Sequence, residues 1–137
     1  RAFAMKSGNK SSIIEKLLVY SQYYKDDYNA IFDNGGCPIL NTATEADDTH
    51  PVLKRLVRVA INKWRANLAK LIREGQEKSE IKPELDPDIY ADIILSLIEG
   101  GGMLSKATGN IQYFFHSLDR VENIILYEMR LIMKRTT

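Results

Sequence analysis

Apolar residues recur at helical spacing along four long stretches of this chain, and turn-forming residues lie between the stretches. Apolar positions that return every three or four residues fall on one face of an α-helix, whereas a strand requires sustained alternation of apolar and polar residues. No such alternation is present in the sequence. The pattern predicts an all-α fold, an antiparallel bundle of about five helices. The expected helices cover residues 12–32, 37–45, 51–79, 87–107 and 111–134.

Capping residues mark the ends of these helices. Ser12 and Glu15 form an S-x-x-E capping box, whose side chains satisfy backbone N–H groups at a helix start. Gly35 follows the first helix, and glycine tolerates the left-handed conformation of a helix stop. Asp86 and Pro87 have the side chains preferred at the N-cap and at the first helical position. Local chemistry and periodicity therefore predict similar helix boundaries.

The helix expected over 87–107 is apolar around roughly two thirds of its circumference, about twice the arc of a peripheral helix. Its own core can cover one side, and the rest would form a larger apolar patch than soluble monomers usually expose. We expect a homodimer in which this helix and the last one form a four-helix bundle with their symmetry mates, with Gly100–Gly102 allowing close approach. The alternative is a central helix buried inside a monomer. The expected interface residues are Ala91, Leu95, Ile98, Gly102, Phe114, Leu118, Val121, Ile125 and Met129.

Composition places the chain among soluble single domains. Its 137 residues suffice for one compact domain and not for two. Cys37 is the only cysteine, which excludes an internal disulfide and favours a reducing, cytoplasmic setting. The longest nearly apolar stretch, 93–104, is too short to span a bilayer. We therefore expect no membrane association.

The charge balance argues against nucleic-acid binding by this chain itself. Nineteen basic and eighteen acidic residues give a formal net charge of +1, whereas nucleic-acid-binding domains usually carry a strong positive excess. Basic residues do cover about half of the helix expected over 51–79. No aromatic side chains alternate with them for stacking on bases, so a solvated face is the favoured interpretation.

Residues that could support catalysis or bind a metal ion are sparse. His50 and His116 have no carboxylate or cysteine nearby at the spacing of metal ligands. Cys37 lies at an expected helix start, which can lower a thiol pKa, but no general base accompanies it. We therefore expect no enzyme activity, no metal site and no cofactor.

One aromatic pattern favours a small-molecule pocket. Tyr20, Tyr24 and Tyr28 follow one another at four-residue spacing on the inward face of the first helix, and Trp64 lies within the apolar stripe of another. A partly apolar cavity with a few polar tips is typical of ligand sites, although such a stripe can also be plain core. The expected pocket residues are Tyr20, Tyr24, Tyr28, Trp64, Leu68, Ile94 and Ile98, with Cys37 and Leu40 at the edge.

Several segments together resemble the C-terminal regulatory domain of the tetracycline-repressor (TetR) family of bacterial transcription factors. The likeness covers about 11–134, and its specificity lies in the order and spacing of the motifs. They are Gly36-Cys37-Pro38-Ile39-Leu40-Asn41 with Glu45-Ala46, Asp48-Thr49-His50-Pro51, Trp64-Arg65, Glu74-Gly75-Gln76, Glu80-Ile81-Lys82-Pro83, Leu85-Asp86-Pro87 and Ala107-Thr108-Gly109.

The resemblance implies that the last two helices form a dimeric four-helix bundle and that the earlier helices hold an effector pocket. It also implies that a ligand changes the separation of two N-terminal helix-turn-helix domains and so controls DNA binding. Residues 1–137 are expected to be one effector-binding and dimerisation domain, with the helix-turn-helix domain absent from this chain. Ser79 departs from the family pattern, which often has glycine there.

The function expected from the sequence is therefore ligand sensing and dimerisation in a TetR-like regulator, acting as a repressor. Its partners would be a second copy, a small effector, and DNA only through the N-terminal domain. Two alternatives remain open: a stand-alone helical dimerisation or adaptor module without a ligand, and a helical-bundle enzyme.

Overall fold

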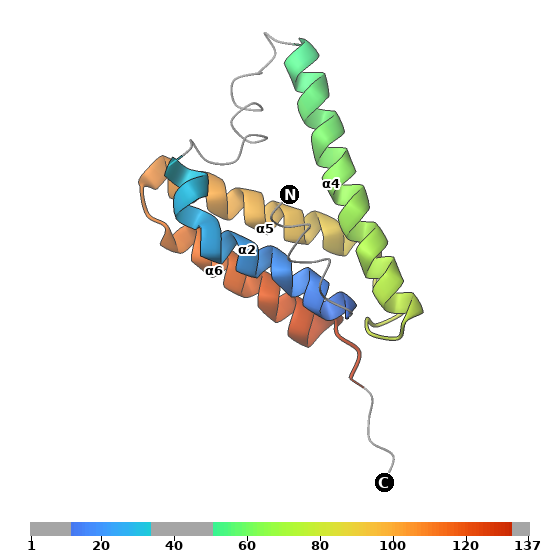
Figure 1. The fold of residues 1–137 in the computed structure, drawn as a ribbon. Coiled ribbons are helices and arrows are strands. Elements are labelled where there is room, and N and C mark those ends of the chain that lie inside the picture. The colour runs from blue at the N-terminus through green and yellow to red at the C-terminus, as the bar shows by residue number, and fades with distance from the viewer. Residues whose placement is uncertain (1–11, 34–50, 133–137) are drawn as a thin grey trace.

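The computed structural model describes residues 12–33 and 51–132 (Figure 1). Over these ranges the chain forms α2 (Ile13–Asp33), α4 (Pro51–Glu77), α5 (Pro87–Thr108), α6 (Gln112–Asn123) and a π-helical segment η1 (Ile124–Met129) that continues α6. The predicted all-α fold is confirmed. The short helix predicted over 37–45 lies outside the described residues.

Helix α5 is central to the packing, since it contacts both α6 and α4, while α2 lies along α6 (Figure 1). The core between these helices consists of aliphatic side chains that solvent barely reaches. Burying each such side chain contributes about 1.5–3 kcal/mol to folding. The most completely buried are Ile13, Leu17, Leu68, Ile72, Ile81, Ile94, Leu118, Val121, Ile125 and Met129.

Helix α4 crosses the other helices steeply (Figure 1). Its buried residues are concentrated in its C-terminal half, at Leu68, Ala69, Ile72 and Gly75. Nearer the N-terminus, Val52, Leu56 and Val59 are exposed among the described residues. Only the C-terminal half of α4 is therefore anchored firmly in the described core.

The connection after α4 is a Schellman-type helix stop. The N–H of Glu80 donates to the Gly75 carbonyl at 2.8 Å, and the N–H of Ser79 donates to the Gln76 carbonyl at 3.1 Å. This pair of bonds satisfies carbonyls that the helix end leaves open, and it requires a left-handed residue at Ser79. Ser79 indeed has a φ of 58°, which explains why the resembling family often has glycine at this position.

The same connection caps the start of α2. The N–H of Glu15 donates to Ser12 Oγ at 3.3 Å, as the predicted capping box requires. Glu80 adds a second cap, since its Oε1 accepts from Ser12 Oγ at 2.7 Å and from the N–H of Ile13 at 2.9 Å. A carboxylate at the positive end of a helix dipole is favourable. Glu80 thereby fastens the end of α4 to the beginning of α2.

The last helix is shorter than the sequence predicted. It was expected to run to Lys134, but the helical backbone ends at Met129 and Arg130 is extended. The reason is competition for backbone hydrogen bonds: the N–H of Lys82 donates to the Met129 carbonyl at 2.9 Å, and the N–H of Leu131 donates to the Glu80 carbonyl at 2.9 Å. These bonds pair the chain end with the connection between α4 and α5.

Candidate functional site

A half-open pocket of about 400 Å³ lies between α2 and α4. Three tyrosines of α2 form one wall, namely Tyr20, Tyr23 and Tyr24, and α4 contributes Ala60, Lys63, Trp64 and Asn67. The residues with polar groups among these seven are three tyrosines, one asparagine and one lysine. Concave, mainly aromatic surfaces with a few polar tips are the usual form of small-molecule sites.

Ring contacts hold the tyrosine wall in place. Tyr24 packs edge-on against Tyr23, with ring centroids 5.4 Å apart, and against Phe114 of α6, with centroids 5.7 Å apart. Such T-shaped pairs add about 0.5–1.5 kcal/mol beyond area burial. Burial also raises the pKa of Tyr20 above its usual 10.0, so this phenol stays neutral and keeps its O–H donor at physiological pH. The wall is therefore rigid, aromatic and uncharged.

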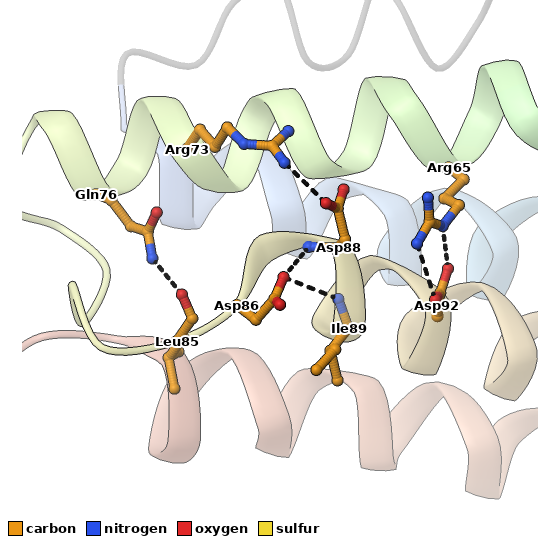
Figure 2. Close-up of polar contacts among 8 residues, drawn as sticks. All are labelled: Arg65, Arg73, Gln76, Leu85, Asp86, Asp88, Ile89 and Asp92. Atoms are coloured by element: carbon orange, nitrogen blue, oxygen red, sulfur yellow. Dashed lines mark hydrogen bonds and ion pairs between the residues drawn. The ribbon is translucent and has the colours of Figure 1, made fainter.

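The opposite wall, α4, is fixed to α5 by polar contacts (Figure 2). Arg65 forms a two-pronged ion pair with Asp92, its Nη2 donating to Oδ2 at 3.1 Å, and Arg73 donates to Asp88 at 3.0 Å. The hydrogen bond and charge of Arg65 lower the pKa of Asp92 below its usual value. Gln76 adds a bond from Nε2 to the Leu85 carbonyl at 2.8 Å. These contacts join α4 to α5 and so connect one wall of the pocket to the central helix.

A second surface is formed by the outward sides of α5 and α6. Large apolar side chains remain exposed there in the single chain, at Ile89, Ile93, Met103, Leu104, Tyr113 and, on η1, Tyr127. Ile89, Ile93, Gly100 and Leu104 lie on one face of α5 by helical spacing. A Cβ built at Gly100 would meet nothing within 4 Å. The outer face of α5 is therefore apolar, and the space next to Gly100 is unoccupied in the single chain.

Neither a metal cluster nor a membrane-spanning helix emerges from the described ranges. Within 12–33 and 51–132, no three His, Cys, Asp or Glu side chains are grouped so that they could hold a metal ion. Of the helices in these ranges, none is long and apolar enough to cross a membrane.

Comparison with known proteins decides the family. Residues 14–121 match the model of the tetracyclin repressor-like C-terminal domain. The chain belongs to the tetracycline-repressor family. A TetR-family transcriptional regulator from Cytophaga hutchinsonii is 33% identical in sequence and has a TM-score of 0.87. The match covers 96% of this chain and 66% of the Cytophaga chain. A TetR transcriptional regulator from Chloroflexus aurantiacus J-10-FL is 30% identical in sequence and has a TM-score of 0.82. This match covers 95% of the present chain and 66% of the Chloroflexus chain.

The TetR-family chain thus spans 66% of the length of each of these two solved relatives. No curated protein matches it. The resemblance inferred from the motifs is confirmed, since the matching family model is that of the C-terminal domain.

The structure brings together only part of the predicted TetR-family pocket. Tyr20, Tyr24 and Trp64 line the cavity, whereas Tyr28 packs edge-on against Phe115 with ring centroids 5.0 Å apart. Three further predicted residues, Leu68, Ile94 and Ile98, are buried core side chains that do not line this pocket. Cys37 and Leu40 lie outside the described residues.

Sequence reasoning missed four lining residues. Tyr23 precedes Tyr24, while Ala60, Lys63 and Asn67 surround Trp64 at positions −4, −1 and +3. Helical spacing from Trp64 was the available signal for Ala60 and Asn67. Lys63 was assigned to the solvated basic face, and it is indeed exposed. Its place in the pocket lining was not predictable, because the wheel shows which side of a helix is polar and not what faces that side.

The single chain buries most of the predicted dimer-interface residues. Seven of the nine are buried inside the single TetR-family chain, and Leu95 and Gly102 are half-buried. Buried side chains offer no surface to a second copy, whereas Leu95 and Gly102 remain partly exposed. The buried seven are Ala91, Ile98, Phe114, Leu118, Val121, Ile125 and Met129.

The predicted role of the glycines also changes. A Cβ at Gly101 would lie 2.5 Å from Ser117 Oγ and 2.7 Å from Ser117 Cβ. Gly101 therefore permits the close approach of α5 to α6 within one subunit. Gly100, by contrast, lies on the outer face.

Proposed function

We propose that this domain senses a small effector and dimerises, so that a TetR-like repressor responds to a ligand. The observation that carries this proposal is the aromatic pocket between α2 and α4. Its volume of about 400 Å³ lies in the range of small-molecule sites, about 300–1,000 Å³. Family membership supports the same assignment.

The second half of the proposal, a homodimer, rests on the outer face of α5 and α6. Ile89 and Tyr127 expose 54% and 69% of their surface in the single chain. Two ~20-residue helices and their symmetry mates can bury an interface well above about 1,000 Å², and a two-fold axis would place the same face of both subunits in contact. A second copy is the partner that matches this face, because a two-fold axis would bring the same apolar face of each subunit together.

The mechanism we propose is a population shift. A ligand that fits between α2 and α4 favours one angle of α4, and α4 is anchored to the dimerisation helix α5 through Arg65 and Arg73. The ligand changes DNA affinity only as far as it prefers one arrangement over the other. DNA itself would be bound by an N-terminal helix-turn-helix in the full regulator.

The pocket is tested with Trp64, the single tryptophan of the chain. Its fluorescence should change saturably with at least one compound in a panel of small aromatic molecules. Ala60→Phe fills the cavity without removing a contact and should abolish the response. Ala66→Phe, at an exposed position of the same helix that does not line the pocket, should leave it intact. A response that survives Ala60→Phe, or none across the panel, contradicts the pocket.

The dimer is tested by charge on the outer face. Ile93→Glu should shift the chain from dimer to monomer in light scattering at micromolar concentration, because a carboxylate would be desolvated between apolar faces. Asn62→Glu adds the same charge to an exposed site on α4 and should leave the dimer unchanged. A wild-type monomer, or an Ile93→Glu dimer of undiminished stability, would refute this interface.

A further inference from the structure

The electrostatic character of the pocket is one-sided. Of the seven side chains that line it, Lys63 carries a charge and no carboxylate is among them. Six further basic side chains and no acidic one lie between residues 51 and 73 of α4, although these six do not line the pocket. Asp88 and Asp92 of α5 pair with this helix through Arg73 and Arg65, neither of which lines the pocket.

We propose that the ligand of this pocket is a small aromatic acid, a planar ring system bearing a carboxylate or an equivalent anion. This inference rests on the proposed function and deepens it, because it specifies the class of effector. The ring would lie between the tyrosine wall and Trp64, and the anion would be held by the Lys63 ammonium.

The arrangement of donors supports this orientation. Lys63 and Asn67 are one helical turn apart on α4 and both line the cavity, so an ammonium and an amide N–H₂ can approach an anion from the same helix. A carboxylate has two oxygens and about four acceptor sites, enough to accept from both of these donors.

Aromatic walls also suit a different ligand, a quaternary ammonium ion held by cation–π contacts. Such sites attract a cation through the ring faces. Here Lys63, an exposed residue of α4, lines the same cavity as those rings, and its positive charge would repel a cationic ligand. An anion is therefore favoured over a cation of the same size.

Three probes of one ring size separate these cases: 2-naphthoate, 2-naphthamide and 2-naphthyltrimethylammonium. Isothermal titration calorimetry of the whole chain should give 2-naphthoate a Kd about tenfold lower than that of the amide, the effect of one charged hydrogen bond in a half-open site. The ammonium probe should bind most weakly. Raising the ionic strength should weaken the naphthoate alone, because salt screens the Lys63 charge.

Substitutions at Lys63 assign the preference to this residue. Lys63→Met should remove the advantage of naphthoate and leave naphthamide binding unchanged, while Lys63→Arg should retain the advantage. Lys70→Met removes a charge of the same helix that does not line the pocket and should change nothing. Circular dichroism confirms that each variant is folded.

The outcomes distinguish the two levels of the proposal. Equal binding of naphthoate and naphthamide, unaffected by Lys63→Met, overturns the aromatic-acid assignment and leaves the pocket standing. Tightest binding of the ammonium probe overturns it in favour of a cation site. If no probe binds and the wider aromatic panel gives no Trp64 response either, the proposed sensing function itself fails.

Discussion

At the scale of single residues, two glycines that adjoin in the sequence have opposite surroundings. Gly101 faces α6, where an added Cβ would lie 2.5 Å from Ser117 Oγ and 3.1 Å from the Tyr113 carbonyl oxygen. Gly100 faces outward, with nothing within 4 Å. The same substitution should therefore have opposite effects at the two positions.

Gly101→Ala should destabilise the domain by about 1–3 kcal/mol, because overpacking forces the helices apart. Gly100→Ala should stabilise the isolated subunit by up to about 1 kcal/mol, the gain in helix propensity. Urea denaturation of both variants, at a concentration where the chain is monomeric, measures the difference. A destabilising Gly100→Ala together with a neutral Gly101→Ala would show that the inner and outer faces of α5 have been exchanged.

Ser79 is a second residue at this scale, and its backbone conformation lowers the stability of the domain. Its φ of 58° lies in the left-handed region, where a side chain costs about 1–2 kcal/mol and glycine does not. Ser79→Gly should raise the stability by about 0.5–1 kcal/mol, less than the full strain because glycine also gains entropy in the unfolded chain. Thermal unfolding checks this. A lower melting temperature would argue against the Schellman stop.

At the scale of helices, the orientation of α4 depends on ion pairs with α5. Because Arg65 lowers the pKa of Asp92 below its usual 3.8, their pairing stabilises the domain above that pH. The stabilisation is lost as the pH falls through the lowered pKa, where Asp92 becomes protonated.

The melting temperature should therefore differ between wild type and Arg65→Met at pH 7, and the difference should shrink towards zero below about pH 4. Arg58→Met, at an exposed position of α4, provides the control. Because the pair is exposed and screened, we expect a shift of only a few degrees. A difference that persists at pH 2 would show that Arg65 acts through packing.

The helices themselves were predictable, because periodicity and capping residues are local signals. The start of α5 at Pro87 follows from Asp86, whose carboxylate accepts the N–H of Asp88 at 2.9 Å. The end of the last helix was not predictable, since Met129 and Leu131 bond to the connection around Glu80 and Lys82. That competition depends on a contact between segments about 50 residues apart.

At the scale of the whole molecule, the excess apolar surface of α5 indicated a partner, but not which face would meet it. A helical wheel shows how much of a helix is apolar, and only the packed neighbours show which part is already covered. Ala91 and Ile98 face the core, whereas Ile89 and Ile93 remain exposed. The pocket was half predicted for the same reason: Tyr24 and Trp64 lie on the apolar faces of their helices, whereas Lys63 lies on the polar side of α4 and still lines the cavity.

The most direct test of the account is a crystal structure of the protein with a compound that produces a saturable Trp64 response. We predict ligand density between α2 and α4, in contact with Tyr24 and Trp64, and a carboxylate beside Lys63 when the compound is an aromatic acid. Density elsewhere, with the space between Tyr24 and Trp64 left empty, would contradict the central claim that this cavity is the sensing site.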